Sequence, residues 1–432
     1  MGAFHSKSTQ NEKACEFDRV FTKNVPHIHE DIFFSLDYDS YKKCLEVSKS
    51  WNELLTSESF LRRGTSVFCE DIQKELLLAA TRGNVDTIRR VLSTFMVDVN
   101  FMKERYGSPL IQAAMNGHKD VVYLLLDGGA EPNMANQNES TPLLYAAQDG
   151  HKDVVQLLLN RGAEPNMANQ KRDTPLHLAA YEGHKDVVQL LLNRGAEPNM
   201  ANQIGSTPLH DAAQEGHKDV VHLLLGKGAE PNGANQVGVT PLHFAAWEGH
   251  KVVVEHLLDR GAEPNIAAQD GKTPLHGAAF KGHKGVVHLL LDRGAEPNMA
   301  AQNGWTPLRW AAFKGNKDVV QLLLDRGAEP NTADQWGFTP LHYAAEEGHK
   351  DVVHHLLGKG AEPNMAAQHG ITPLHCAAQE GCKGVVKLLL DRGAAPNMEC
   401  QDGRTPLSIA LQMGHMEIAK MIKRNLKKLA VK

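Results

Sequence analysis

A block reading Thr-Pro-Leu-His, or a close variant of it, recurs every 33 residues along most of this chain. Its prolines stand at positions 109, 142, 175, 208, 241, 274, 307, 340, 373 and 406. A fixed period of about 20–50 residues indicates a stack of similar supersecondary units rather than one globular core. Each unit in such a stack buries its apolar face against its neighbours, so the chain presents an extended surface whose default role is to hold another protein.

One such unit, residues 174–206, predicts two short helices and a loop. Thr174 is a good N-cap, and Pro175 then takes the first helical position, where its missing N–H costs nothing. Gly183 suits the left-handed position that ends this helix. A second helix is expected from near His184 to Gly195, with an apolar face formed by Val187, Val188, Leu190, Leu191 and Leu192. The following residues are rich in Pro, Asn and Gly and predict a turn-forming loop.

The repeated unit resembles the ankyrin repeat, whose typical run T-P-L-H-x-A-A-x-x-G-H-x-x-V-V-x-L-L-L-x-x-G-A-x-x-N is matched closely in most units. A degenerate further unit begins near Glu75, and regular units begin at Ser108, Thr141, Thr174, Thr207, Thr240, Thr273, Thr306, Thr339, Thr372 and Thr405. The resemblance implies an all-α ankyrin-repeat solenoid over residues 71–425. It would contain about eleven helix–turn–helix units with β-hairpin-like loops, and the first and last units would cap the stack.

Composition narrows the class of protein further. The chain has 432 residues and a net charge of −5, which gives no case for nucleic-acid binding. No apolar run reaches the ~18 residues needed to span a bilayer, and no apolar secretory segment opens the chain. The six cysteines are scattered without a CxxC pair, which is neither a zinc pattern nor a disulfide framework. We therefore expect a monomer in the reducing cytoplasm, and a nuclear location stays open.

The residues before the repeats are a different kind of sequence. Residues 1–23 are polar, and we expect them to be a mobile N-terminal segment. Residues 24–64 predict a small helical domain, in which Ile32, Phe33 and Leu36 share one helical face. The core stripe of a second helix follows, with spacings of three, three and four residues, at Tyr41, Cys44, Val47 and Trp51.

This segment resembles an F-box, whose pattern runs roughly L-P-x-E-x-x-x-x-I-L-x-x-L and then, after about ten residues, V-C-x-x-W. Val25 and Pro26 open the match, and Ser48 replaces the usual Cys. The interval between Pro26 and Ile32 is one residue shorter than in the family pattern. The resemblance implies docking on the Skp-family adaptor of a cullin–RING ubiquitin ligase through Pro26, Ile32, Phe33, Leu36, Val47 and Trp51. The alternative is a helical segment that only caps the repeats.

An F-box joined by a short link to ankyrin repeats predicts the substrate-recognition subunit of an SCF-type cullin–RING ligase. The alternative is an ankyrin scaffold protein with no ubiquitin-ligase role. Most of the 23 histidines recur with the repeat, because the fold recurs. Gly-rich phosphate loops, G-x-S-x-G elbows and H-E-x-x-H motifs are absent. We therefore predict a non-catalytic adaptor without a cofactor or a metal site.

Information about the target lies in residues that do not recur. Aromatic residues gather at two first-helix positions and at loop tips of neighbouring units, so we expect the rings to form one strip. Next to this strip, basic residues stand at positions where most other repeats carry an acidic residue or a histidine. The candidate target-binding residues are Phe244, Trp247, Phe280, Lys281, Trp305, Arg309, Trp310, Phe313, Lys314, Trp336, Phe338 and Tyr343. Exposed aromatics are common hot-spot residues, and the bases favour a target with an acidic or phosphorylated segment. The alternative is that some rings pack between repeats.

The two ends carry further signals. The N-terminal sequence MGAFHS fits the pattern for N-myristoylation of Gly2. One such lipid chain gives only weak membrane binding, so we expect membrane association only if Gly2 is modified. The stretch from Lys420 onward is basic, and we expect a solvated cap helix followed by a basic tail over residues 426–432.

Overall fold

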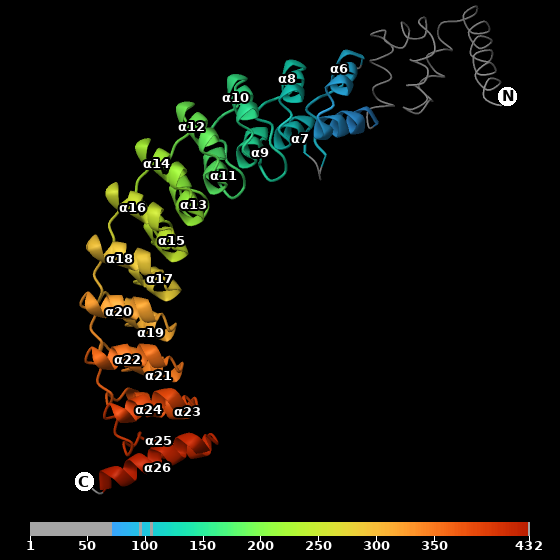
Figure 1. Cartoon of the computed structure of the whole chain (residues 1–432). Coiled ribbons are helices and arrows are strands. Elements are labelled where there is room, and N and C mark those ends of the chain that lie inside the picture. The colour runs from blue at the N-terminus through green and yellow to red at the C-terminus, as the bar shows by residue number, and fades with distance from the viewer. Residues whose placement is uncertain (1–70, 95–96, 104–106, 431–432) are drawn as a thin grey trace, which may run out of the picture. The chain divides into compact units, whose positions relative to one another are not determined.

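The computed structural model describes residues 71–94, 97–103 and 107–430, in which short helices alternate with loops at the period of the sequence repeat (Figure 1). The F-box-like segment over 24–64, the N-terminal segment over 1–23 and Gly2 lie outside the described residues. The described residues form two compact units. The first holds those up to Pro175 together with Asn193–Ala196, and the second holds Leu176–Leu192 and those from Glu197 onward.

Helices of the first unit come in pairs, one pair to a repeat. Residues 71–82 are helical and precede α6 (Val85–Thr94). The later helices of this unit are α7 (Pro109–Met115), α8 (Lys119–Asp127), α9 (Pro142–Gln148) and α10 (Lys152–Asn160).

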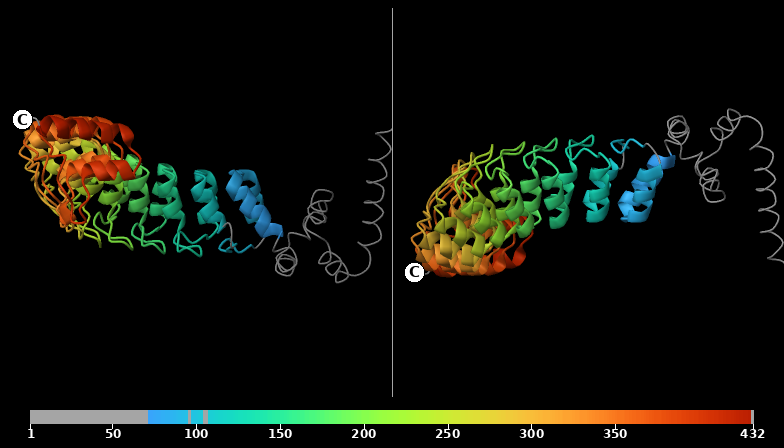
Figure 2. Two further views of the ribbon diagram at one scale, coloured as in Figure 1. Left: turned by 90° about the horizontal axis from the view of Figure 1, so that it is seen from below. Right: turned by 90° about the horizontal axis from the view of Figure 1, so that it is seen from above.

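The second unit repeats the same pairing. Its helices are α11 (Pro175–Tyr181), α12 (Lys185–Asn193), α13 (Pro208–Glu215), α14 (Lys218–Gly226), α15 (Pro241–Glu248), α16 (Lys251–Asp259), α17 (Pro274–Lys281), α18 (Lys284–Asp292), α19 (Pro307–Phe313), α20 (Lys317–Asp325), α21 (Pro340–Glu346), α22 (Lys350–Gly358), the 3₁₀ helix η1 (Gln368–Gly370), α23 (Pro373–Gln379), α24 (Lys383–Asp391), α25 (Pro406–Gln412) and α26 (Met416–Ala430). From α13 to α23 the first helices of successive repeats pack in one layer, and from α14 to α24 the second helices pack in another (Figure 1). The connecting loops lie together on one side of the helices (Figure 2).

The histidine of the Thr-Pro-Leu-His block links each repeat to the next one. Thr207 caps α13 with an extended backbone, and Pro208 takes the first helical position. The N–H of Thr207 donates to Nδ1 of His210 at 3.0 Å, and Nε2 of His210 lies 3.1 Å from the carbonyl oxygen of Val239, the residue just before Thr240 of the following repeat. Because Nδ1 accepts a backbone N–H, the proton of the neutral ring is on Nε2, which donates to that carbonyl. The same arrangement recurs at His243, His276, His342 and His375.

Two other recurring side chains complete the links between repeats. The histidine before each second helix reaches back one repeat, as where Nε2 of His250 lies 2.8 Å from the carbonyl oxygen of Gln214. The asparagine of the GAEPN loop reaches forward: Nδ2 of Asn232 donates to the carbonyl of Gly261 at 2.9 Å, while its Oδ1 accepts the N–H of Glu263 at 2.9 Å. Recurrence of these residues therefore reflects the register of the stack.

Two details differ from the sequence expectation. The loops are tight turns, and the described residues contain no extended strand, only an isolated bridge between Lys103 and Gly107. Successive loops are still joined by backbone hydrogen bonds, as from the N–H of Gln236 to the carbonyl of Ile204 at 3.0 Å. At the other end, α26 continues to Ala430 with Ile422 buried, so residues 426–430 extend the last helix rather than form a separate tail.

In the described part of the chain, no helix combines the length and the apolar character that crossing a bilayer requires.

Candidate protein-binding site

Six aromatic side chains of the second unit are joined by ring contacts, and we call them the aromatic strip: Trp247, Phe280, Trp305, Trp310, Phe313 and Tyr343. The rings of Trp247 and Phe280 stack at 5.3 Å between centroids, and Phe280 meets Trp310 edge-on at 5.0 Å. Trp305 lies 4.2 Å from Trp310 and 5.7 Å from Tyr343. The strip extends over α15, α17, α19 and α21 because their repeats stack in register.

The strip is not uniformly accessible. The side chain of Trp247 at one end is exposed, at 38%. Trp305 and Trp310 are half-buried, and their indole N–H groups are enclosed without a hydrogen-bond partner among the described residues. These two rings therefore contribute to packing between repeats, whereas Trp247 offers a ring to a partner.

Two exposed lysines lie over the strip. Nζ of Lys281 is 5.0 Å from the ring centroid of Trp247, and Nζ of Lys314 is 4.8 Å from that of Phe280. Ammonium groups at such distances are attracted to the faces of aromatic rings. Neither lysine forms an ion pair with a residue that the structure describes. The surface of the strip is therefore apolar with two available positive charges.

Arg309 was expected in the same exposed basic patch, and the structure places it elsewhere. Its side chain is 1% exposed and its Nη2 lies 2.9 Å from Oδ2 of Asp334, whose side chain is also fully buried. The guanidinium lies between the rings of Trp305 and Tyr343, 3.0 and 3.6 Å from their centroids. Burial lowers the pKa of Arg309 to about 10, so the group stays charged at neutral pH. The guanidinium of Arg309 is therefore part of the packing between side chains and is not accessible to a target.

Two of the three remaining predicted aromatics lie beside the strip. Phe338 is 5.6 Å from the ring of Tyr343, and Phe244 meets the buried ring of His210 edge-on at 6.1 Å. Trp336 occupies a loop tip, is 43% exposed and has no ring partner among the described residues. The structure thus brings together most of the predicted aromatic residues but leaves Trp336 apart from them.

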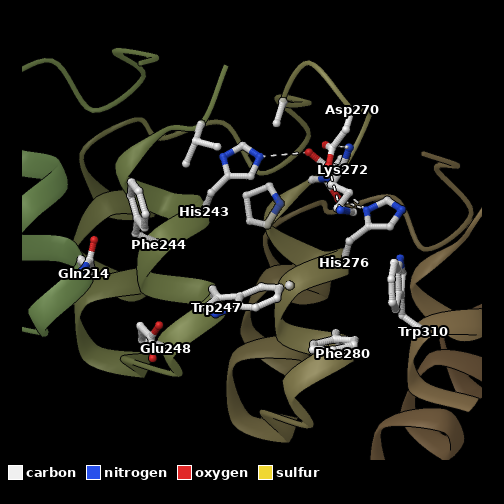
Figure 3. Close-up of a pocket in the computed structure, with 15 residues that line it drawn as sticks. Gln214, His243, Phe244, Trp247, Glu248, Asp270, Lys272, His276, Phe280 and Trp310 are labelled. Carbon is white, nitrogen blue, oxygen red and sulfur yellow. Dashed lines mark hydrogen bonds and ion pairs between the residues drawn. The ribbon is translucent and has the colours of Figure 1, made fainter. Parts of the chain in front are cut away.

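A hollow of about 430 Å³ opens at the Trp247 end of the strip. Its aromatic walls are Phe244, Trp247, Phe280 and Trp310 (Figure 3). Gly277 in α17 also lines it, at a position where neighbouring repeats carry Phe244 and Trp310. This volume falls within the range of about 300–1,000 Å³ that is usual for ligand sites.

The rim of the hollow carries charged residues that the sequence analysis did not single out. Nζ of Lys272 lies 2.7 Å from Oδ2 of Asp270, so these two charges neutralise each other. Glu248 lies on the side of α15, with its carboxylate turned away from Asp270 and Lys272 in Figure 3. In the sequence, the hollow is indicated only by a glycine at the position that holds Phe244 and Trp310 in the neighbouring repeats. Whether such a glycine leaves open space depends on how the surrounding rings pack.

Metal-ligating, thiol and imidazole side chains of the described residues are held in structural roles or stay apart from one another. No cluster of three or more His, Cys, Asp or Glu side chains within the described residues could hold a metal ion. Burial raises the pKa of the Cys376 thiol to about 12, so it remains protonated at neutral pH. Both ring nitrogens of the buried block histidines are occupied, since Nδ1 caps the histidine's own helix and Nε2 bonds a carbonyl 29 residues later.

Comparison with known proteins identifies the repeats. A family model described as ankyrin repeats (3 copies) matches residues 76–169, 162–235, 232–301, 275–367 and 341–430. No F-box domain is detected, and no curated protein matches the chain. Since the matches extend without a gap from residue 76 to residue 430, this chain belongs to the ankyrin repeat family, and its repeats form a protein-binding scaffold.

Proposed function

We propose that the second unit holds a target protein on the aromatic strip and that the chain is a non-catalytic adaptor built around this contact. The observation that carries the proposal is the run of rings at Trp247, Phe280 and Phe313. These residues occupy one equivalent position in three successive repeats. The same position is polar in the repeats on either side, at Gln214 and Glu346. A stack needs no rings there, so their presence supports a binding role.

The charges beside the strip support a particular kind of target. Lys281 and Lys314 replace the acid that most other repeats carry at this position, as at Glu215 and Glu248. An apolar target segment with a carboxylate or a phosphate group would place its rings or aliphatic chains on the strip and its anion near the two lysines. We therefore propose a target with an acidic or phosphorylated segment.

Truncating Trp247 to Ala is expected to weaken target binding by about 2 kcal/mol, or about 30-fold, because Trp247 is the exposed ring at the end of the strip. The target would be identified by affinity purification and mass spectrometry, and its Kd measured by titration calorimetry. Gln379→Ala, at the equivalent position three repeats beyond Phe280, is the matched control and should leave the Kd unchanged. Unchanged affinity in Trp247→Ala, with a lowered melting temperature, would show that the ring is only packing.

For residues 24–64 we propose the F-box role, so that the chain would bring its target to an SCF-type ubiquitin ligase. Support comes from the sequence pattern: Val25 and Pro26 at the start, Ile32 to Leu36 on one face, and Val47 to Trp51 at the family spacing. The ankyrin family match neither requires nor excludes this role. The second candidate is an ankyrin scaffold without a ligase.

Deleting residues 1–64 is expected to abolish co-purification of a Skp-type subunit while the repeats remain folded, because all six proposed docking residues are removed. Quantitative mass spectrometry of purified complexes measures the first effect, and the far-UV circular dichroism melt measures the second. Pro26→Ala combined with Leu36→Ala offers a smaller perturbation of the same contact. Co-purification that survives the deletion would exclude the F-box role and favour the plain scaffold.

A further inference from the structure

The hollow at the end of the aromatic strip exists because Gly277 has no side chain. Gly277 stands inside α17, at the position held by Phe244 one repeat earlier and by Trp310 one repeat later. Both rings line the hollow, with Trp247 and Phe280 between them (Figure 3). A cavity of roughly 150 Å³ can hold a benzene ring, so 430 Å³ gives room for one aromatic side chain and part of its backbone.

The backbone does not require a glycine at this position. The φ angle of Gly277 is not in the left-handed region, and a glycine inside a helix is less stable than an alanine. A Cβ atom added here would lie 3.2 Å from Cε3 of Trp247, with no backbone atom closer than 3.6 Å. A larger side chain would have to move the ring of Trp247 or extend past it into the hollow that Gly277 lines. Leu178 at the equivalent position shows that the fold accepts a large side chain there.

The surroundings of the hollow match one kind of occupant. Four rings form its walls, and aromatic rings favour offset or edge-on contact with another ring. Asp270 and Lys272 neutralise each other at the rim, and the neighbouring His243 and His276 have a lowered pKa because they are buried, so both rings are neutral at pH 7. Glu248 lines the hollow on the α15 side, whereas Lys281 and Lys314 lie outside its lining, over the rings of Trp247 and Phe280. A bound segment would therefore meet positive charges on the Phe280 side and away from Glu248.

We propose that this hollow is the anchor pocket of the target surface, taking one aromatic side chain of the partner protein while an acidic residue of the same segment lies over Lys281 and Lys314. The inference rests on the proposed target-binding function. It adds where the target is anchored, which class of target side chain enters the hollow, and on which side of the hollow the target's negative charge lies. The acidic residue follows from charge complementarity: the two lysines have no carboxylate partner among the described residues.

The test uses a phage-displayed library of random 12-residue peptides selected on the full chain, with the enriched peptides measured by fluorescence anisotropy. We expect the enriched peptides to share an aromatic residue with Asp or Glu close to it. Gly277→Leu, which fills the hollow, should weaken their binding at least about tenfold, and Gly277→Ala should weaken it less. The melting temperature of each variant without peptide is measured as well. Replacing a helical glycine stabilises the helix, but the added Cβ lies 3.2 Å from Cε3 of Trp247, so that ring must shift by a few tenths of an ångström.

Charge is tested with the same peptides. Replacing their Asp or Glu by Asn or Gln should weaken binding to the wild-type chain, and this loss should disappear in the Lys281→Glu, Lys314→Glu double variant. A library that yields no enriched peptide, or peptides without a shared aromatic residue, would overturn the pocket assignment. So would unchanged affinity in Gly277→Leu. If Trp247→Ala weakens the peptides and Gly277→Leu does not, the pocket is wrong and the target surface stands; if neither does, the proposed surface fails as well.

Discussion

Acidification from pH 7 to pH 5 is expected to destabilise the second unit by roughly 6 kcal/mol, because three buried histidines resist protonation in the folded chain. Burial lowers the pKa of His210, His276 and His342 from 6.5 to about 4. Below pH 6.5 the unfolded chain binds protons at these rings and the folded chain does not. The contribution of these rings to the free energy of unfolding is therefore complete above pH 6.5 and decreases as the pH falls toward 4. At pH 5 the loss is roughly 2 kcal/mol for each ring.

The structural reason for the shift lies in the capping of the first helices. Nδ1 of His276 accepts the N–H of Thr273 at 3.0 Å, so a proton placed on Nδ1 would set two donors against each other. Nε2 already donates to the carbonyl of Trp305, the residue just before Thr306 of the following repeat. Protonation thus breaks the cap of α17 and places a charge on a buried ring, and the nearby carboxylate of Asp270 offsets the cost of burial only in part.

Urea unfolding followed by circular dichroism at pH 7, 6 and 5 measures this effect, above the range where ordinary carboxylates titrate. The matched control is the triple variant His210→Gln, His276→Gln, His342→Gln. A glutamine at this position of a capping box still accepts the threonine N–H through its side-chain oxygen, and it does not titrate. The variant is less stable at pH 7 but should lose markedly less stability than the wild type between pH 7 and pH 5. The loss that remains comes from His243 and His375, whose pKa is also lowered by burial. An equal loss of stability in both proteins would place the acid sensitivity in other groups.

Asp334→Ala is expected to destabilise the second unit by about 3–5 kcal/mol, because it leaves the buried guanidinium of Arg309 without its counter-charge. The carboxylate of Asp334 also accepts three hydrogen bonds. Its Oδ1 accepts the backbone N–H groups of Trp336 and Phe338, each at 2.9 Å, and its Oδ2 accepts the hydroxyl of Tyr343 at 2.8 Å. Arg309→Met should be similarly costly, since it leaves a buried carboxylate without a cation.

The other repeats provide the control for this pair. Arg309 stands where most repeats have the block histidine, and Asp334 stands where three others have alanine, at Ala268, Ala301 and Ala367. The double variant Arg309→His, Asp334→Ala therefore recreates the combination found at His276 and Ala301. We expect it to recover most of the stability that either single change removes, with a coupling energy of at least about 2 kcal/mol in the double-mutant cycle. Additive losses would mean that the two residues contribute independently.

Local structure could be predicted from the sequence because it depends on residues a few positions apart. Thr-Pro and Gly predicted a first helix from Pro175 and a second from near His184, and the structure has α11 from Pro175 and α12 from Lys185. Of the predicted apolar face, Val187, Val188 and Leu191 are buried. N-caps, N1 prolines and left-handed glycines act within one turn of helix, so a single sequence contains everything that decides them.

The chemistry of the site could not be predicted in the same way. Arg309 was expected at the surface, but it is buried because Asp334, 25 residues later, supplies a carboxylate at 2.9 Å, and because two rings enclose the guanidinium. Gly277 is one more departure from the repeat in the sequence, and the hollow beside it depends on Phe244 and Trp310, which stand one repeat away on either side. The repeat by itself determined the helices, their caps and the register of the stack. Burial and free space depend on which side chains of neighbouring repeats meet, and only the tertiary structure decided that.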